Sequence, residues 1–99
     1  MMTPTYSLAH AERLARVGGE YGLHLRAAQR LGDIACTFSS VVRLSRVDTD
    51  EEVDGKSILA ILSLGAACGD TLFIRARGGD AEEAVRALQH LVEDDSLDA

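Results

Sequence analysis

Apolar and polar positions along the chain follow two different periods, which together predict seven elements. Apolar residues recur at helical spacing in three segments, namely residues 25–36, residues 58–64 and a segment that starts at Asp80. They alternate with polar residues over 12–18, 39–46 and 70–77, and a short strand ending at Asp54 follows an acidic hairpin tip at 48–52. The predicted order is therefore β-α-β-β-α-β-α.

This order predicts an α+β fold, an open-faced β-sandwich with three helices on one face of a four-stranded, mostly antiparallel sheet. One domain over residues 12–93 contains all seven elements. Residues 1–11 lack periodicity and are expected to form a loose N-terminal extension. Residues 94–99 are expected to form an acidic, frayed tail.

Two of the predicted helices begin with residues that favour a helix start. Ser57 can cap the second helix through its hydroxyl group. Asp80 and Glu83 have the spacing of a capping box at the start of the third helix. We therefore expect side-chain hydrogen bonds at both helix N-termini.

The second predicted helix carries more apolar residues than one buried face can hold. We expect Ile61 and Leu64 to point into the core, which leaves Ile58, Leu59 and Leu62 partly exposed. An exposed apolar patch on a small acidic domain suggests a surface where protein partners dock. The alternative is a helix that is buried on several sides.

The overall charge excludes several classes of partner. The 99 residues carry a net charge of −6, and Lys56 is the only lysine. Nucleic-acid binding needs clustered basic residues and an anionic membrane attracts basic ones, so we expect neither partner. The chain has no apolar stretch of membrane-spanning length and no signal-peptide pattern, so we expect a cytoplasmic protein. Cys36 and Cys68 lack metal or redox spacing and are expected to be free, buried thiols.

The residues with candidate chemistry lie at the start of the first predicted helix. Gly22 breaks the chain, His24 stands where the helix begins, and Arg26 lies in its first turn. A helix start offers unpaired N–H groups and the positive end of the helix dipole, which together suit a phosphate. A neutral imidazole can attack phosphorus there, and a guanidinium can bind phosphoryl oxygens. The alternative is a surface histidine that merely marks the helix start. The His, Cys and Asp residues lack metal-ligand spacing, so we expect no metal or cofactor.

Taken together, several segments resemble the histidine-containing phosphocarrier (HPr) family of the bacterial phosphoenolpyruvate-dependent phosphotransferase system. The resemblance covers about residues 12–93 and includes the family's β-α-β-β-α-β-α order. The matching segments are Gly22-Leu23-His24-x-Arg26, Lys56-Ser57-Ile58 with Leu64-Gly65, Gly69-Asp70-Thr71 and Gly78-Gly79-Asp80.

The resemblance implies a phosphoryl carrier rather than an enzyme. Enzyme I would phosphorylate His24 on Nδ1, Arg26 would contact the phosphoryl group, and an IIA domain would accept it. Ser57 matches the serine that HPr kinase/phosphorylase modifies in many relatives. The common docking face would include the apolar side chains of Leu25, Ile58, Leu59 and Leu62. We expect the carrier to be a monomer.

Two residues beside the site depart from the family pattern. Ala27 stands where the family usually has proline, and Leu25 replaces a more usual small or polar residue. These departures leave a second hypothesis open, in which the domain is a regulatory module that acts through Ser57 or through partner binding rather than in sugar transport. A small-molecule-binding regulatory domain is a third.

Overall fold

A computed structural model describes residues 9–97, so parts of the predicted N-terminal extension and acidic tail lie outside the described chain. The elements follow the predicted order. They are β1 (His10–Arg16), α1 (Leu25–Cys36), β2 (Val41–Arg46), β3 (Glu52–Asp54), α2 (Ile58–Ser63), β4 (Thr71–Arg77) and α3 (Ala81–Glu93).

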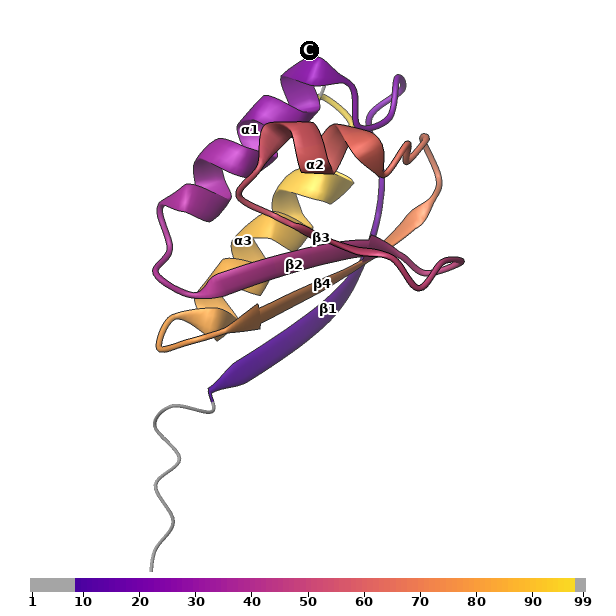
Figure 1. Ribbon diagram of the computed structural model, residues 1–99. Coiled ribbons are helices and arrows are strands. Elements are labelled where there is room, and N and C mark those ends of the chain that lie inside the picture. The colour runs from indigo at the N-terminus through magenta and orange to yellow at the C-terminus, as the bar shows by residue number, and fades with distance from the viewer. Residues whose placement is uncertain (1–8, 98–99) are drawn as a thin grey trace, which may run out of the picture.

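The four strands form one sheet in the order β1-β4-β2-β3, and every pairing is antiparallel. The strand β4 lies in the middle, where Arg77 is paired with His10 of β1 on one side and with Val41 of β2 on the other. All three helices lie over one face of this sheet, and the other face is open (Figure 1). The predicted α+β open-faced sandwich is confirmed.

The core lies between the helices and the covered face of the sheet. Alternate residues of the two central strands point into it, as the sequence predicts for strands with one solvated face. The strand residues that are almost fully buried include Val42, Leu44, Leu72, Ile74 and Ala76. They pack against the buried stripes of α1 and α3, whose members include Ala28, Leu31, Val85 and Leu88.

The first strand begins and ends two residues earlier than predicted. Its pairing with β4 starts at His10, and its inward positions include Ala11 and Ala15, which are 6% and 1% exposed. Alanine has a weak preference for strands and valine a strong one. Val17 therefore extended the predicted strand beyond its real end at Arg16. Val17 instead donates its amide to the Asp70 carbonyl at 2.8 Å, just past the end of the strand.

The predicted capping box of Asp80 and Glu83 is wrong. Asp80 is the N-cap of α3 but makes no side-chain hydrogen bond to that helix. Its carboxylate instead accepts hydrogen bonds from the amides of Ser39 and Ser40, each at 2.9 Å, and from both hydroxyl groups. These two serines are therefore turned toward Asp80, and β2 begins after them rather than at residue 39 as predicted.

The prediction of a frayed tail is wrong for the residues up to 97. Leu97 is fully buried, and Asp94 accepts a hydrogen bond from the Ser96 amide at 2.9 Å. The guanidinium of Arg30 on α1 donates to the carbonyls of Ser96 and Leu97, at 3.1 and 2.9 Å. Burial of the Leu97 side chain therefore packs the otherwise acidic segment 94–97 against the core.

The helices α1 and α2 pack closely because of a glycine. A Cβ at Gly32 of α1 would lie 3.1 Å from Cγ1 of Ile58, so a side chain there would push the second helix away. The thiol of Cys36 contacts the Lys56 carbonyl at 3.7 Å, which places the start of α2 beside the end of α1. Cys36 and Cys68 are free, as predicted, but both are exposed rather than buried.

We predict that Asp80→Asn lowers the stability of the protein at neutral pH, because the amide nitrogen faces donors that the carboxylate now accepts. The hydrogen bonds from Ser40 and Ser39 lower the pKa of Asp80 from 3.8 to about 2. A depressed pKa in the folded state stabilises the fold above the unfolded value, and this contribution is lost as the pH falls toward 2. Urea unfolding midpoints measured from pH 7 down to pH 2 should therefore converge for the two proteins. Asp33→Asn, on the exposed side of α1, is the control, and an unchanged midpoint for Asp80→Asn at pH 7 would contradict the prediction.

We also predict that Leu97→Ala lowers the free energy of unfolding by about 2–4 kcal/mol, because it opens a cavity in the core. The matched control is Leu59→Ala on α2, where the leucine is 78% exposed and the same change should cost under about 0.5 kcal/mol. Denaturant unfolding of the two variants measures the difference. Equal costs would mean that the last turn is not part of the core.

Candidate functional site

His24 is the N-cap residue of α1 and its side chain is exposed, as the sequence predicts. Its backbone is extended, with φ −78° and ψ −178°, and its carbonyl accepts the first helical bond from the Ala28 amide at 2.8 Å. The His24 amide donates to the Gly22 carbonyl at 2.9 Å. The imidazole therefore sits on a fixed backbone at the mouth of the helix, where a partner protein can reach it.

The residues before His24 are held by a second loop. Leu23 is 5% exposed, and its amide donates to the Ala66 carbonyl at 3.0 Å. Gly22 has φ +73°, and a Cβ there would lie 2.5 Å from that same carbonyl oxygen. Only glycine fits this conformation and this approach without strain. The hydrogen bond and the close contact together set the direction in which the chain enters α1.

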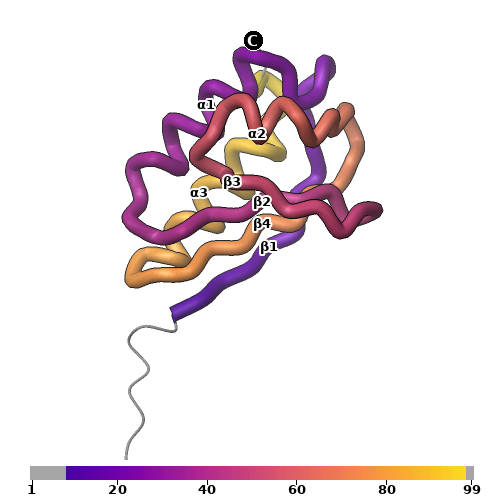
Figure 2. The backbone as a smooth tube through the Cα atoms, in the orientation of Figure 1, coloured from indigo at the N-terminus to yellow at the C-terminus, as the bar shows by residue number. Residues whose placement is uncertain are grey.

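The loop that receives Leu23 is itself well tied. The Asp70 carboxylate accepts a hydrogen bond from the Ala67 amide at 2.8 Å. The Gly69 amide donates to the Val17 carbonyl at 2.8 Å, which links this loop to the end of β1. Figure 2 shows both loops, near residues 20 and 67, at the same end of the molecule. The candidate site therefore rests on two loops that brace each other.

The start of α1 differs from the starts of the other two helices. The Ser57 hydroxyl caps α2 by accepting from the Ala60 amide at 3.2 Å, as predicted, and α3 has Glu82 and Glu83 in its first turn. The first turn of α1 has no acidic residue, and His24 makes no side-chain hydrogen bond to its amides. Its N–H groups and positive dipole end are therefore available to an anion, and no carboxylate of the first turn repels one.

Arg26 lies in the same first turn and is exposed. It follows His24 by two residues and adds a permanent positive charge where the helix dipole is also positive. Ala27, which is fully buried, keeps an N–H group that proline would lack at this position. This arrangement can bind a phosphoryl group through backbone amides and a guanidinium.

The His24 side chain lies on the surface of the domain. The hollows that the structure describes on the open face of the sheet and between α1 and α3 are not lined by His24. Between residues 9 and 97, the structure has no group of three His, Cys, Asp or Glu side chains that could hold a metal ion. Chemistry at His24 would therefore need the surface of a second protein to surround the reacting group.

Ser57 lies away from His24. A Cβ at Gly32 of α1 would lie 4.0 Å from the Ile58 amide, and Cys36 contacts Lys56, so the start of α2 is beside the second half of α1. Eight residues of helix separate His24 from Gly32, which is roughly 12 Å at 1.5 Å per residue. The two predicted phosphorylation positions are therefore separate sites.

The apolar side chains predicted for docking are exposed to different degrees. Leu25 is 56% exposed and Leu59 is 78% exposed, whereas Ile58 and Leu62 are half-buried against the core. Tyr21 was not among the predicted residues, yet it is 68% exposed in the loop that leads to His24. The sequence does contain a signal for Tyr21, because a large aromatic residue stands between Gly18-Gly19 and Gly22.

Comparison with known proteins places this arrangement in a family. The family model described as "PTS HPr component phosphorylation site" matches residues 11–94. The phosphocarrier protein HPr of Haloferax volcanii is 37% identical over 81 residues, which are 82% of this chain and 91% of that protein. The chain belongs to the HPr family. HPr of Cupriavidus necator is 36% identical over 81 residues, covering 82% of this chain and 89% of the relative.

A solved HPr structure agrees with this assignment. The phosphocarrier HPr of Bacillus anthracis superposes with a TM-score of 0.79 at 31% sequence identity, over 85% of this chain and 98% of that one. The chain is thus a phosphocarrier component of the phosphotransferase system by family, with the HPr fold. In the described part of this HPr-family chain, no helix is long and apolar enough to span a membrane.

We predict that Gly22→Ala destabilises the protein more than Gly65→Ala does. Both glycines have positive φ, +73° and +61°, so alanine is strained at either position. A Cβ at Gly65 meets nothing within 4 Å, whereas at Gly22 it meets the Ala66 carbonyl. We expect costs of about 1–2 kcal/mol at Gly65 and about 2–4 kcal/mol at Gly22. Urea unfolding measures both, and faster hydrogen exchange of the Leu23 amide in Gly22→Ala alone would locate the damage. Equal costs with equal exchange would contradict the prediction.

Proposed function

We propose that this HPr-family chain accepts a phosphoryl group from phosphorylated enzyme I on Nδ1 of His24 and donates it to IIA-type proteins. The observation that supports this most is the exposed imidazole at a helix N-terminus that has neither a side-chain cap nor an acidic first turn. In the proposed step, a ring nitrogen of His24 bonds to phosphorus as the bond between phosphorus and the donor histidine breaks. The reverse exchange on an IIA domain regenerates free His24.

The chain's own residues would position the phosphoryl group and balance its charge. The backbone amides of the first turn and the guanidinium of Arg26 would donate hydrogen bonds to its oxygens. Such donors are already in place before the reaction, so little reorganisation is needed. The partner would supply the rest of the site and exclude water. The domain would therefore act as a stoichiometric carrier, and we place it in the cytoplasm with these partners.

Docking would use the exposed apolar side chains next to His24 and those of α2. Leu25 and Leu59 are the most exposed of the predicted set, Ile58 and Leu62 would form the half-buried margin, and Tyr21 would extend the surface on the loop side. Apolar contacts of this kind can be shared by several partners because they demand little directional fit. Leu25, next to the histidine, would influence which partner is preferred.

A regulatory role through Ser57 is the second candidate function. Its hydroxyl lies at the N-terminus of α2, close to the positive end of the helix, where a phosphate is favoured. HPr kinase/phosphorylase would be the partner, and phosphate on Ser57 would change the charge at the edge of the α2 docking surface. This role and the carrier role are compatible, because His24 lies at the start of α1 and Ser57 lies at the start of α2, which is beside the second half of α1.

We predict that incubation with enzyme I and phosphoenolpyruvate adds the mass of one phosphate, that acid removes it, and that His24→Ala abolishes the gain. His90→Ala, which removes an exposed histidine on α3, is the matched control and should be labelled normally. Arg26→Ala should slow the transfer roughly 10- to 100-fold, as expected for the loss of a charge-assisted hydrogen bond. Intact-mass spectrometry over time measures all four proteins.

The same experiment separates the two candidate functions. Acid-labile phosphate that depends on His24 supports the carrier. Acid-stable phosphate that depends on Ser57, formed with a kinase and ATP and without labelling of His24, supports the regulatory module instead. No acid-labile gain under conditions that label a known HPr would contradict the carrier proposal.

A further inference from the structure

The planar peptide group between Ala66 and Ala67 is held from both sides. Its C=O accepts the hydrogen bond from the Leu23 amide at 3.0 Å, and its N–H donates to a carboxylate oxygen of Asp70 at 2.8 Å. A hydrogen bond on one side of a peptide group polarises it and strengthens the bond on the other side. The carboxylate is a charged acceptor, so its bond is the stronger of the two. The Asp70 side chain therefore supports the contact that directs the chain into α1.

The same connection continues to the backbone of His24. The Leu23 amide shares its peptide group with the Gly22 carbonyl, and that carbonyl accepts from the His24 amide at 2.9 Å. An unbroken path of hydrogen bonds and rigid peptide groups thus leads from the Asp70 carboxylate to the backbone nitrogen of His24. Every N–H group along this path points toward the carboxylate, which is the direction that a negative charge favours.

The position of the His24 nitrogen decides where the imidazole points. His24 has an extended backbone with ψ −178°, and its carbonyl already belongs to the hydrogen bonding of α1. The nitrogen and Cβ of a residue turn together about its Cα–C bond, because both are bonded to Cα at fixed angles. Holding the nitrogen therefore holds the direction of the side chain relative to the first turn of the helix. Phosphoryl transfer depends on that direction, since a misplacement of about 1 Å can slow a reaction about 100-fold.

The turn that contains Asp70 is closed by its backbone. The Asp70 amide donates to the Ala67 carbonyl at 3.0 Å. The Asp70 carbonyl and the Gly69 amide pair with the amide and carbonyl of Val17, each at 2.8 Å. The carboxylate adds the hydrogen bond to the Ala67 amide. Removal of the side chain therefore leaves the bonds of the turn in place and frees the peptide group that receives Leu23.

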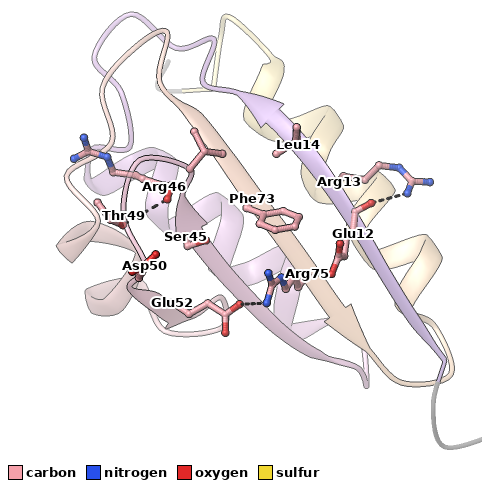
Figure 3. Close-up of a pocket in the computed structure, with 11 residues that line it drawn as sticks. Glu12, Arg13, Leu14, Ser45, Arg46, Thr49, Asp50, Glu52, Phe73 and Arg75 are labelled. Carbon is pink, nitrogen blue, oxygen red and sulfur yellow. Dashed lines mark hydrogen bonds and ion pairs between the residues drawn. The ribbon is translucent and has the colours of Figure 1, made fainter.

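Arg46, at the end of β2, contacts both ends of this loop. Its Nη1 donates to the carbonyl of Leu64, the C-cap of α2, at 3.4 Å, and its Nε lies 3.9 Å from the Asp70 carboxylate. Its guanidinium points away from Phe73 and from the middle of the open face of the sheet (Figure 3). The loop is therefore anchored at both ends, and the Ala66 carbonyl lies between these anchors.

We propose that Asp70 is a positioning residue for phosphoryl transfer at His24. Its carboxylate fixes the peptide groups that lead to the His24 nitrogen, so that the imidazole is already oriented when a partner brings its phosphoryl group. Asp70 takes no proton and forms no bond to phosphorus in this role, and it acts through the hydrogen bonds of the backbone. The role rests on the proposed carrier function and adds to it a residue from outside the His24 segment.

The rate of transfer from phosphorylated enzyme I to the full chain tests this role. Rapid quenching at several enzyme I concentrations gives the saturating rate and the concentration of half-saturation. We expect Asp70→Ala to lower the saturating rate roughly 10-fold and to change the half-saturating concentration less than about twofold, because orientation is lost and docking is not. Asp70→Asn keeps an oxygen that can accept from the Ala67 amide but loses the charge, so its rate should lie between those of Asp70→Ala and the original chain. An unchanged saturating rate with a raised half-saturating concentration would make Asp70 a docking contact and overturn the proposal.

Two control variants separate positioning from charge and from stability. Asp48 also pairs with Arg46, at 2.8 Å, and in the part of the chain that the structure describes its carboxylate binds only that residue. Asp48→Ala therefore removes the same charge without affecting the path to His24. Val85 of α3 is fully buried, so Val85→Ala lowers stability through the core. Both controls should transfer phosphate at the original rate, and a loss as large as that of Asp70→Ala in either would overturn the proposal.

Amide hydrogen exchange tests the path of hydrogen bonds without any phosphoryl transfer. In Asp70→Ala the Leu23 amide should exchange at least about tenfold faster than in the original chain. The increase should exceed that of the Ile74 amide, which lies in the central strand and reports unfolding of the whole domain. Unchanged exchange at Leu23, or an equal increase at both amides, would overturn the proposal. Asp70→Asn takes the place of Asp70→Ala if the latter does not fold.

The outcomes for the carrier function and for Asp70 are distinct. If the original chain takes no phosphate from enzyme I, the carrier function is wrong and the positioning role fails with it. If the original chain is labelled and Asp70→Ala is labelled equally fast, the carrier function stands and the role of Asp70 is overturned.

Discussion

The hydrogen bond from the Leu23 amide to the Ala66 carbonyl is the constraint on which the His24 site depends. It joins a loop that follows β1 to a loop that precedes β4, and these strands are neighbours in the sheet. It forms only because the chain at Gly22 takes a left-handed turn with no side chain in the way. The Leu23 side chain is buried, and it anchors the loop before α1 on the core. Sheet, loops and the first helix thus act together to present one imidazole.

The three helices begin in three different ways, and the differences match their proposed roles. The α2 helix is capped by its own serine, and the Asp80 that precedes α3 binds the segment before β2 instead. Only α1 has neither a side-chain cap nor an acidic residue in its first turn. An uncapped start lowers helix stability by about 1 kcal/mol, and here the neighbouring loop contacts offset that cost. A serine or aspartate at position 24 would cap α1 and stabilise the helix more than His24 does.

The sequence allowed the element order, the inward positions of β2 and β4 and the location of His24 to be predicted, because each depends on local spacing or a short motif. It did not allow the ends of β1 or the partner of Asp80 to be predicted, because both are set by residues far along the chain. Leu97 illustrates the same limit, since one apolar residue among acidic ones gives no period to detect. Gly32, which costs helix stability when considered locally, is explained only by the approach of Ile58.

The central place of β4 has a consequence for how the chain acquires its shape. Both β1 and β2 pair with β4, and β4 is the last strand to leave the ribosome. At about 5–20 residues per second, β1 waits several seconds before its partner exists. The nascent chain can form α1 and the β2–β3 hairpin in that time, but its sheet closes only after synthesis of the last strand. Such non-local pairing favours folding of the whole domain at once over stepwise growth from the N-terminus.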